Sequence, residues 1–411
     1  MINKDRLWNH LMTLGKIGAS EDSKEGITRL AYTKEDVEAK VLVKKYMEEA
    51  GLNVHEDGVG NLIGKREGQN PELPGIMIGS HIDTVFQGGK FDGALGVLAG
   101  VEVAHALKEE GYSLKRKLEV VAFADEEGAR FSTGMLGSQA MAGKVKEEML
   151  DKKDKDGISL GEALKEKGFD PNKIQEVKRE KGSIAAYLEL HIEQAVQLER
   201  KEKSVGIVTG IAGPRWFKIT VKGESGHAGS TPMSMRRDPM SASVRLIQSI
   251  EEIVSAKENT VGTVGKIEVK PGGINIIPSE VTFTLDLRDS RESERQTAEE
   301  EIRKTAKDLE VKQGVTIVFE QLHNLDPILC DEKIVTIAEE SAKETGVEYL
   351  KMISGAAHDT INIAEFAPVG MLFIPSFNGL SHRPDEWSEK KDCGNGAKVL
   401  YQTVKILDGK L

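Results

Sequence analysis

In the first part of the chain, short apolar runs alternate with a helical pattern. The apolar runs are rich in β-branched residues, as buried strands are, and they cover residues 75–83, 118–124 and 184–194. Between the first two runs, a helical pattern extends from Ala94 to Glu109 and is closed by Gly111. This alternation predicts an α/β domain with a mainly parallel mixed sheet flanked by helices. The charged stretch near 144–181 is expected to be helical and mostly exposed.

From about Gly213 the pattern changes to strands with a period of two. Amphipathic strands are expected at 217–223, 260–270 and 280–289, and helices at 238–256 and 291–310. Such strands favour an antiparallel sheet with one face covered by helices, which is an α+β module. The buried-strand pattern then returns at 347–360 and 369–376.

We therefore predict two domains. Residues 1–212 and 329–411 form a catalytic metal-binding domain, and residues 213–328 form an inserted dimerisation or lid domain. A hinge near residues 210–214 and 326–330 would let the inserted domain close over a substrate and exclude water.

Composition narrows the functional classes. The 411 residues are 39% hydrophobic and 30% charged, which excludes a disordered chain and a membrane protein. A net charge of −11 without a Lys/Arg stripe argues against nucleic acid as a partner. No apolar run has the length of a membrane span or resembles a secretory signal, and Cys330 and Cys393 are too distant in sequence to indicate a disulfide scaffold. A cytoplasmic protein is expected.

Histidines at the ends of apolar runs are the first candidates for chemistry. His81 and His191 each close a predicted strand, and His382 follows another, each with a carboxylate within a few positions. Ligands of open α/β sheets bind beyond the carboxyl ends of the strands, so these three side chains can converge in one crevice. Taken singly, each histidine would more often be a hydrogen-bonded structural residue.

Carboxylates accumulate at the same places. Asp92 lies in a glycine-rich segment before the 94–109 helix, and Glu126 and Glu127 follow a strand in "ADEEG". Singly, Asp92 could be a helix cap and the glutamates solvated loop residues. Together with the histidines they form a set with no basic residue in the same motifs, and uncompensated buried acids are costly. Bound divalent cations would resolve that cost.

Six motifs in order along the chain resemble the M20 family of dinuclear metallohydrolases. They are "GSHIDTV", "GGKFDGALGVLAG", "FADEEGARF", "ELHIEQ", "GHAGSTPM" and "GLSHRPDEW". The resemblance is to the branch of N-carbamoyl-L-amino-acid hydrolases and allantoate amidohydrolases, and it extends over essentially the whole chain.

The resemblance implies two divalent cations per subunit, which could be Mn, Co, Ni or Zn. The implied ligands are His81, Asp92, Glu127, His191 and His382, with Asp92 bridging the two cations, His81 and His191 completing one site, and Glu127 and His382 the other. Asp83 would orient His81, and Glu126 would act as the general base. Spacing alone leaves open which of the two adjacent glutamates binds metal.

Further residues are candidates for substrate binding. The resemblance implies that His227 reaches the site across a dimer interface and stabilises the oxyanion, so a homodimer is expected. Arg288 ends the strand at 280–289 and matches a substrate carboxylate, although a surface ion pair with Asp286 or Asp289 is an equal alternative. The other implied contacts are Gln194, Asn275, Gly355, Ala356 and His358.

The implied activity is metal-dependent hydrolysis of N-carbamoyl-L-α-amino acids to the free L-amino acid, ammonia and CO2. Allantoate amidohydrolase is the alternative enzyme, because it shares every metal ligand. The stretches "GIAGPRWF" and "ISGAAHDT" are more similar to the carbamoylase branch, since the allantoate branch tends to carry Gln-Arg where Pro214 and Arg215 stand. An acylase or dipeptidase is less expected, since those relatives usually carry an acid at the position of His191. A metal-stabilised dimeric binding protein without turnover is the other class, and Glu126 argues against it.

Overall fold

The computed structural model describes residues 1–20 and 25–411, and the chain forms two compact units. The first comprises Met1–Thr209, Cys330–Met352 and His358–Leu411, and the second comprises Gly210–Leu329 and Ile353–Ala357. The sequence assigned residues 210–212, 329 and 353–357 to the catalytic domain, whereas they belong to the second unit. The reason is local bonding: the Ala212 amide donates to the Ser354 carbonyl (2.8 Å), and the Arg288 Nη1 donates to the Gly355 carbonyl (2.8 Å).

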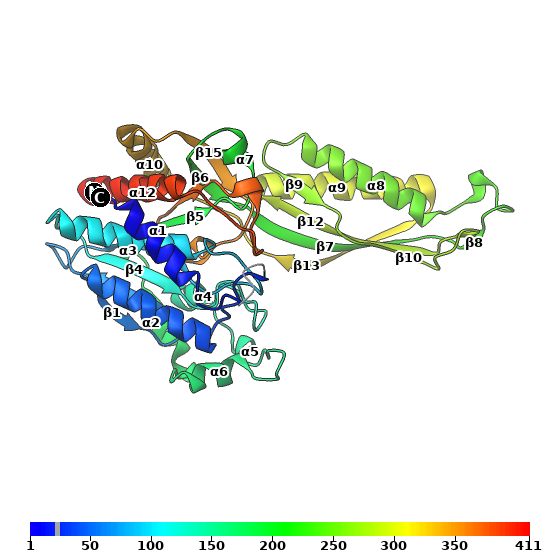
Figure 1. The fold of residues 1–411 in the computed structure, drawn as a ribbon. Helices are drawn as coiled ribbons and strands as arrows, with labels where there is room; N and C mark the ends of the chain where they lie inside the picture. The colour runs from blue at the N-terminus through cyan, green and yellow to red at the C-terminus, as the bar shows by residue number, and fades with distance from the viewer. Residues whose placement is uncertain (21–24) are drawn as a thin grey trace. The chain divides into compact units, whose positions relative to one another are not determined.

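The main sheet of the first unit is a nine-stranded mixed sheet (Figure 1). In spatial order its strands are β1 (Asn53–Glu56), β2 (Leu62–Arg66), β4 (Leu118–Phe123), β3 (Gly75–His81), β5 (Ile184–Ile192), β16 (Val369–Ile374), β6 (Val205–Ile211) and β14 (Ile328–Leu329), with β15 (Tyr349–Ser354) also beside β6. The four neighbours β4, β3, β5 and β16 are parallel, and the pairs β1–β2, β2–β4, β16–β6 and β14–β6 are antiparallel. The expected mainly parallel mixed sheet is confirmed.

The parallel strands are buried on both faces, which explains their continuous apolar pattern. In β5, Ala186, Leu188 and Leu190 join the main hydrophobic cluster on one face. The alternate residues Glu189 and His191 are equally buried but face the other way, toward polar partners. The same strand therefore supplies core packing on one side and chemistry on the other.

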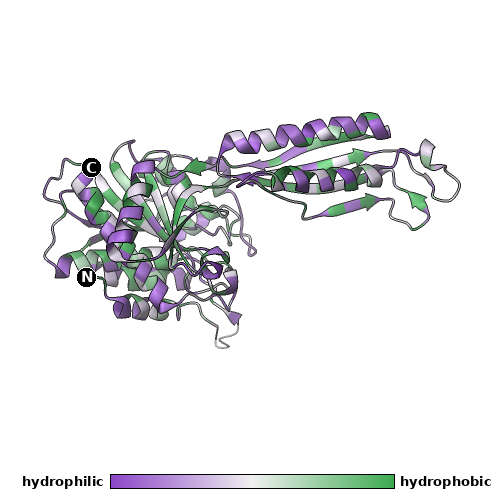
Figure 2. Ribbon diagram, turned by 90° about the horizontal axis from the view of Figure 1, so that it is seen from above, coloured by the Kyte–Doolittle hydropathy of each residue, from purple (hydrophilic) through white to green (hydrophobic). Residues whose placement is uncertain are grey.

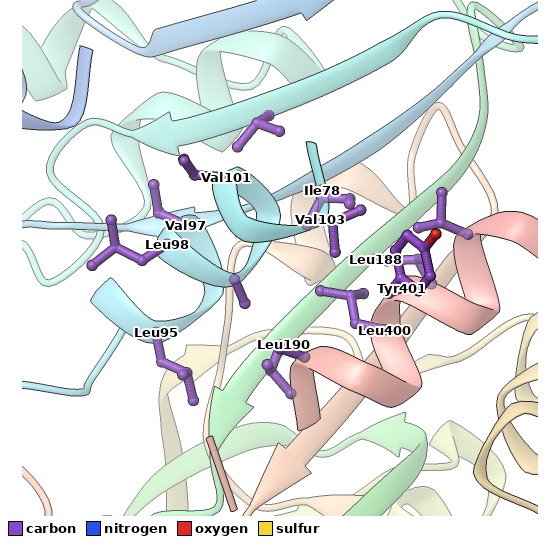
Figure 3. Packing of buried hydrophobic residues seen from close by; sticks show 14 of the residues in the cluster. Ile78, Leu95, Val97, Leu98, Val101, Val103, Leu188, Leu190, Leu400 and Tyr401 are labelled. Carbon is purple, nitrogen blue, oxygen red and sulfur yellow. The ribbon is translucent and has the colours of Figure 1, made fainter. Parts of the chain in front are cut away.

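Helices pack against the apolar face of these strands. Buried residues of α1 (Lys4–Leu14), α2 (Lys34–Glu49), α3 (Ala94–Glu109), α10 (Glu332–Thr345) and α12 (Lys390–Lys410) form one cluster with the sheet. Figure 3 shows side chains of α3, β5 and α12 together in this cluster, among them Val103, Leu188 and Leu400. A β-carbon at Gly96 of α3 would lie 2.4 Å from the Leu190 carbonyl oxygen, so this glycine lets the helix lie close to the sheet.

The stretch 144–181 differs from the expectation of one exposed helical segment. It contains only short helices, namely α5 (Glu147–Leu150), α6 (Leu160–Glu166) and the 3-10 helix η2 (Pro171–Val177). Leu160, Leu164 and Ile174 are buried in a second cluster with Phe131 and Leu136, the first residue of α4 (Leu136–Ala142). Charged residues outnumber the apolar residues of this segment that are buried. The pattern of the sequence therefore does not reveal which of its residues join the core.

The second unit contains a five-stranded antiparallel sheet. Its strands are β10 (Ile267–Lys270), β12 (Glu280–Asp289), β7 (Gly213–Lys222) and β13 (Thr316–Asn324), with β9 (Val261–Thr263) also beside β12. The helices α8 (Pro239–Ser255) and α9 (Glu292–Gln313) bury their apolar sides with Phe217, Ile219, Phe283 and Leu285 of the sheet. Their other sides are hydrophilic, as the purple of the two long helices in Figure 2 shows.

A separate two-stranded pair, β8 (Gly226–His227) with β11 (Ile276–Ile277), belongs to the same unit. The remaining short helices are α7 (Gln197–Arg200) and α11 (Thr360–Ile363). Among the helices of residues 1–20 and 25–411, none combines the length and apolar character needed to cross a bilayer.

Candidate metal centre

The carboxyl ends of four neighbouring parallel strands meet at one edge of the sheet. His81 is the last residue of β3, and His191 is the next to last of β5. Glu126 and Glu127 follow β4, and His382 follows β16. Asp92 lies directly before Gly93, which begins α3. Strand order thus brings together residues that are up to about 300 positions apart in sequence, as expected for an open α/β sheet.

Asp92 is the common partner of the three imidazoles. Its Oδ1 lies 3.1 Å from His191 Nε2 and 3.6 Å from His81 Nε2. Its Oδ2 lies 3.1 Å from His382 Nε2, which in turn is 3.6 Å from Glu127 Oε1. The two carboxylate oxygens therefore face two different sets of side chains.

These side chains fit divalent cations. In each of the groups His81, Asp92, His191 and Asp92, Glu127, His382, the potential ligand atoms lie within 4.8 Å of one another. Two further groups meet the same criterion, namely His81, Glu126, Glu127 and Glu189, His191, His358. Imidazole nitrogen and carboxylate oxygen are ligands that Zn and its first-row neighbours accept. All five predicted metal ligands converge, with Asp92 in both of the first two groups.

Gly93 is required for this approach. Its φ is +64°, and a β-carbon there would lie 2.4 Å from ring atoms of His81. A left-handed backbone without a side chain lets Asp92 turn beside the imidazole.

The imidazoles are oriented by the backbone. His81 Nδ1 lies 3.1 Å from the Asp83 carbonyl oxygen, and His191 Nδ1 lies 2.9 Å from the Ile192 carbonyl oxygen. A carbonyl only accepts, so each Nδ1 is the protonated nitrogen, and each Nε2 is directed at Asp92 as a potential ligand.

The role of Asp83 differs in part from the expectation. Its carboxylate lies 3.7 Å from His81 Nδ1, and the closer contact to that nitrogen is its backbone carbonyl. The carboxylate instead accepts the backbone N–H groups of Glu126 (3.2 Å) and Glu127 (3.1 Å). Asp83 therefore links the loop after β3 to the loop after β4, and it holds both glutamates.

The three consecutive acids of "ADEEG" point in different directions. Glu126 Oε2 lies 3.5 Å from His81 Nε2, and Glu127 faces His382. Asp125 has a φ of +53° and turns away, so that its Oδ2 accepts from Thr133 Oγ1 at 2.5 Å. The backbone after β4 thus directs the three acidic side chains toward different partners.

Burial and mutual repulsion shift the proton affinities of the centre. Burial raises the pKa of Glu127 to about 7, with the neighbouring Asp92 carboxylate adding to the effect. Burial also raises the pKa of Glu126 well above its usual value, against the pull of His81. The hydrogen bond to Asp92 raises the pKa of His382 to about 9. The site therefore retains protons at positions where a divalent cation would replace them.

Gln194 and His358 lie beside these ligands. Gln194 has a φ of +58°, and its Nε2 donates to Asp92 Oδ2 at 2.9 Å. The ring of His358 is buried, with its centroid 4.5 Å from that of His191. Burial holds the pKa of His358 well below its usual value.

The candidates Arg288, Gly355 and Ala356 meet within the second unit. The Arg288 guanidinium pairs with both carboxylate oxygens of Asp286, through Nε at 3.0 Å and Nη2 at 2.9 Å. Its Nη1 donates to the Gly355 carbonyl, and the next residue, Ala356, bonds through its backbone to Ser354 Oγ. The ion pair with Asp286, which the sequence left open, is therefore present.

His227 and Asn275 are close neighbours elsewhere in that unit. His227 pairs with Ile276 across β8 and β11, and the Asn275 carbonyl accepts from the Ala228 amide. His227 Nδ1 accepts the amides of Gly229 (3.1 Å) and Ser230 (3.2 Å). The neutral imidazole therefore carries its proton on Nε2, as an exposed donor.

Several residues of the centre were missed by the sequence analysis. Ser381 Oγ lies 2.9 Å from Asp92 Oδ2, and Glu386 accepts the backbone amide of Asp92. Ser376 Oγ accepts the amide of Gln194 at 3.0 Å. Only one signal in the sequence could have found the first two, namely their position on either side of His382 in "GLSHRPDE".

Comparison with known proteins gives full-length matches. A model of peptidase family M20/M25/M40 matches residues 77–406. The chain is 49% identical over 404 residues to N-carbamoyl-L-amino acid amidohydrolase of Geobacillus stearothermophilus, with 98% of each chain covered. It is 37% identical over 402 residues to allantoate amidohydrolase of Bacillus subtilis (strain 168), with 97% of this chain and 96% of that one covered. An amidase of the hydantoinase/carbamoylase family from Burkholderia multivorans superposes with a TM-score of 0.90 at 34% identity, covering 99% of this chain and 98% of that one.

Proposed function

The chain belongs to the amidohydrolase branch of peptidase family M20, and from this premise we propose that it hydrolyses N-carbamoyl-L-α-amino acids. Water would cleave the ureido C–N bond, giving the L-amino acid and carbamic acid, which decomposes to ammonia and CO2. One observation carries the proposal: Asp92 faces two ligand groups, and Glu126, whose side chain is 11% exposed, lies beside one of them. The 49% identity to a carbamoyl amino acid amidohydrolase supports this substrate class.

The M20 family is metal-dependent, and we propose two divalent cations, one in each group that contains Asp92. When bound, such cations supply Lewis acidity, which acidifies a water molecule and polarises the scissile carbonyl. The donor set does not select among Mn, Co, Ni and Zn.

Glu126 would carry the proton. The backbone N–H of Glu126 donates to Asp83, and the Glu126 carboxylate lies 3.5 Å from His81 Nε2. A carboxylate in this position can take the proton of the attacking water and return it to the leaving nitrogen. Burial raises the pKa of Glu126, which favours a group that accepts a proton and then releases it.

Arg288 would bind the substrate α-carboxylate. Its bonds to Asp286 and Gly355 use three N–H groups, which leaves two of the five donors of a guanidinium for a ligand. Asp286 would fix the plane of the guanidinium for that contact. Gly355, Ala356 and His358 are proposed to line the same substrate site, together with Gln194 and Asn275.

His227 would stabilise the oxyanion through Nε2–H, and we propose that it acts in a homodimer. Support comes from apolar side chains exposed in the same unit, since Met233 is 77% exposed, Met235 72% and Ile274 103%. Light scattering coupled to gel filtration tests the dimer, and a monomer at working concentration would contradict it. The hinge, the lid role and the cytoplasmic location stay predictions.

The test of the function is a substrate panel on Mn²⁺-loaded protein, read as ammonia release for the carbamoyl compounds and allantoate and as free amino acid for the N-acetyl compounds. The panel contains N-carbamoyl-L-amino acids, their D-enantiomers, N-acetyl-L-amino acids and allantoate. We expect turnover of the N-carbamoyl-L compounds and none of the D-enantiomers. If allantoate is hydrolysed faster than the N-carbamoyl-L compounds, the function is instead that of an allantoate amidohydrolase, which the 37% identical relative also supports. Metal binding with no turnover of any compound would favour a binding protein.

A further inference from the structure

Glu386 is a buried acid that none of the proposed chemical steps uses. It follows His382 by four positions, is 3% exposed, and turns inward beside Asp92. Its Oε1 accepts two consecutive backbone amides, those of Phe91 (2.9 Å) and Asp92 (3.1 Å). Its Oε2 lies 2.9 Å from Ser381 Oγ, which is also 2.9 Å from Asp92 Oδ2. One side chain thus connects the loop of Asp92 with the loop of His382.

Two independent features accommodate this contact. A β-carbon at Gly89 would lie 2.1 Å from the carboxyl carbon of Glu386, so only glycine fits there. The residues adjacent to the contact, Phe91 and Trp387, pack edge to face with ring centroids 5.5 Å apart. The Asp92 loop is therefore shaped to receive Glu386, and the pairing of the two loops does not depend on one hydrogen bond.

Asp92 needs such a support because its loop has no regular structure of its own. Residues 82–93 connect β3 to α3 without a strand or a helix, yet the two oxygens of Asp92 must face two ligand groups. Outer residues that hydrogen-bond to metal ligands orient those ligands and affect metal affinity strongly. A second carboxylate next to Asp92 is unfavourable by itself, and cations at Asp92 would offset that cost.

We infer that Glu386 is a positioning residue of the metal centre, which fixes Asp92 through its backbone amide and through Ser381. The contact fixes the position of the Asp92 carboxylate relative to His382, the proposed ligand that lies near the C-terminal end of the sequence. This inference rests on the metal centre of the proposed function but not on the identity of the substrate.

The experiment measures Mn²⁺ binding to the full chain, by electron paramagnetic resonance of the free ion, together with the melting temperature of metal-free protein. Glu386→Ala removes all three contacts, and we expect Mn²⁺ affinity to fall by about 10–100-fold. Glu386→Gln should retain most of the affinity, because the amide oxygen can accept both backbone N–H groups and the amide nitrogen can donate to Ser381. Asp385→Asn is the matched control, since among the described residues this exposed neighbour pairs with Arg383 alone, and the variant should bind Mn²⁺ like wild type.

Gly89→Ala tests the contact from the opposite loop. The added methyl group occupies the place of the Glu386 carboxylate, so affinity should fall as in Glu386→Ala. Combining the two substitutions should cause little further loss, because both remove the same contact. A purely structural role would lower the melting temperature and leave the affinity of the folded fraction unchanged.

The outcomes separate this inference from the proposed function. Wild-type affinity in Glu386→Ala, or equal damage from Glu386→Gln, would overturn the positioning role. Failure of wild-type protein to bind either Mn²⁺ or Zn²⁺ would overturn it together with the metal centre. Normal binding without hydrolysis of any substrate would overturn only the proposed function.

Discussion

Each unit contains a cluster of largely buried charged side chains, and the two clusters are compensated differently. In the second unit, the guanidinium of Arg295 is fully buried and meets Glu292, and Arg215 meets Glu299 at 2.6 Å. In the first unit, among the described residues, the ion pairs of Asp92, Glu126 and Glu127 are all with histidines. Imidazoles are neutral near pH 7 unless an acid holds their proton.

The difference separates a structural network from a binding site. Opposite full charges in the second unit neutralise each other and need no ligand. The first unit has an excess of acid that protons neutralise only in part, so it favours added cations.

Removing the shared carboxylate should have the largest effect. Asp92→Asn takes one charge from both ligand groups, so metal affinity should fall by more than the roughly 100-fold upper range for residues outside the ligand set. Hydrolysis should fall to background. Elemental analysis after dialysis measures the metal content, and two metals per chain in the variant would refute the shared-ligand geometry.

Glu126→Gln should separate chemistry from metal binding. We expect kcat to fall by about 10²–10⁴-fold, the range for loss of a general acid or base, while the metal content stays that of wild type. Asp125→Asn is a useful neighbour control, because Asp125 turns toward Thr133 and away from the centre. Loss of metal in Glu126→Gln would instead identify this residue as a ligand.

Breaking the ion-pair network around Arg295 should lower the free energy of unfolding and leave metal binding unchanged. Arg295→Met leaves the carbonyls of Gly213 and Leu325 without their partner, and we expect a loss of about 3 kcal/mol in unfolding free energy, at the low end for a buried pair because Glu292 is half exposed. Denaturant unfolding measures it, with exposed Lys304→Met as the control. Altered metal affinity in folded Arg295→Met would contradict the separation of the two regions.

Arg288 tests whether one guanidinium serves both a protein partner and a substrate. Arg288→Ala should lower kcat/KM for the N-carbamoyl-L-amino acid by about tenfold or more, equivalent to roughly 1.5 kcal/mol for a hydrogen bond to a charged group. Exposed Arg291→Ala should match wild type. A normal kcat/KM in Arg288→Ala would show that Arg288 does not bind the substrate and serves only in the ion pair with Asp286.

Metal affinity should depend on pH in a defined direction. With pKa values of about 7 for Glu127 and about 9 for His382, both groups carry a proton at pH 6, and a cation must displace it. Affinity should therefore rise from pH 6 to 9, by up to about tenfold per pH unit for each proton displaced. Calorimetric titrations at several pH values test this, and a flat profile would contradict the proton-loaded state.

Regular elements could be predicted closely from the sequence. The helix at 94–109 has the predicted bounds because an all-round apolar pattern between a glycine-rich start and Gly111 leaves no other structure, and the strand at 280–289 follows from strict alternation. The convergence of His81, His191 and His382 could be predicted because strand ends share an edge, whereas the proposed ligand set, with Glu127 rather than Glu126, depends on the resemblance to family M20. Ser376, Ser381 and Glu386 could not, because contacts between irregular loops have no periodicity.

Arg215 lies in a network of polar side chains of the second unit. The pair Pro214 and Arg215 favoured carbamoyl substrates over allantoate, yet Arg215 bonds to Asn324, Gln296, Glu299 and Glu292 within the second unit. The substrate panel decides between the two activities.

The aiming of His81 and His191 by main-chain carbonyls has a consequence for how such an enzyme can change. Because carbonyl oxygens are present whatever the side chains are, replacing side chains near this edge of the sheet leaves these two proposed ligands correctly directed. Mutations of residues that contact the substrate can then change substrate preference while the two imidazoles keep their direction. This edge of the sheet therefore tolerates mutations that alter specificity.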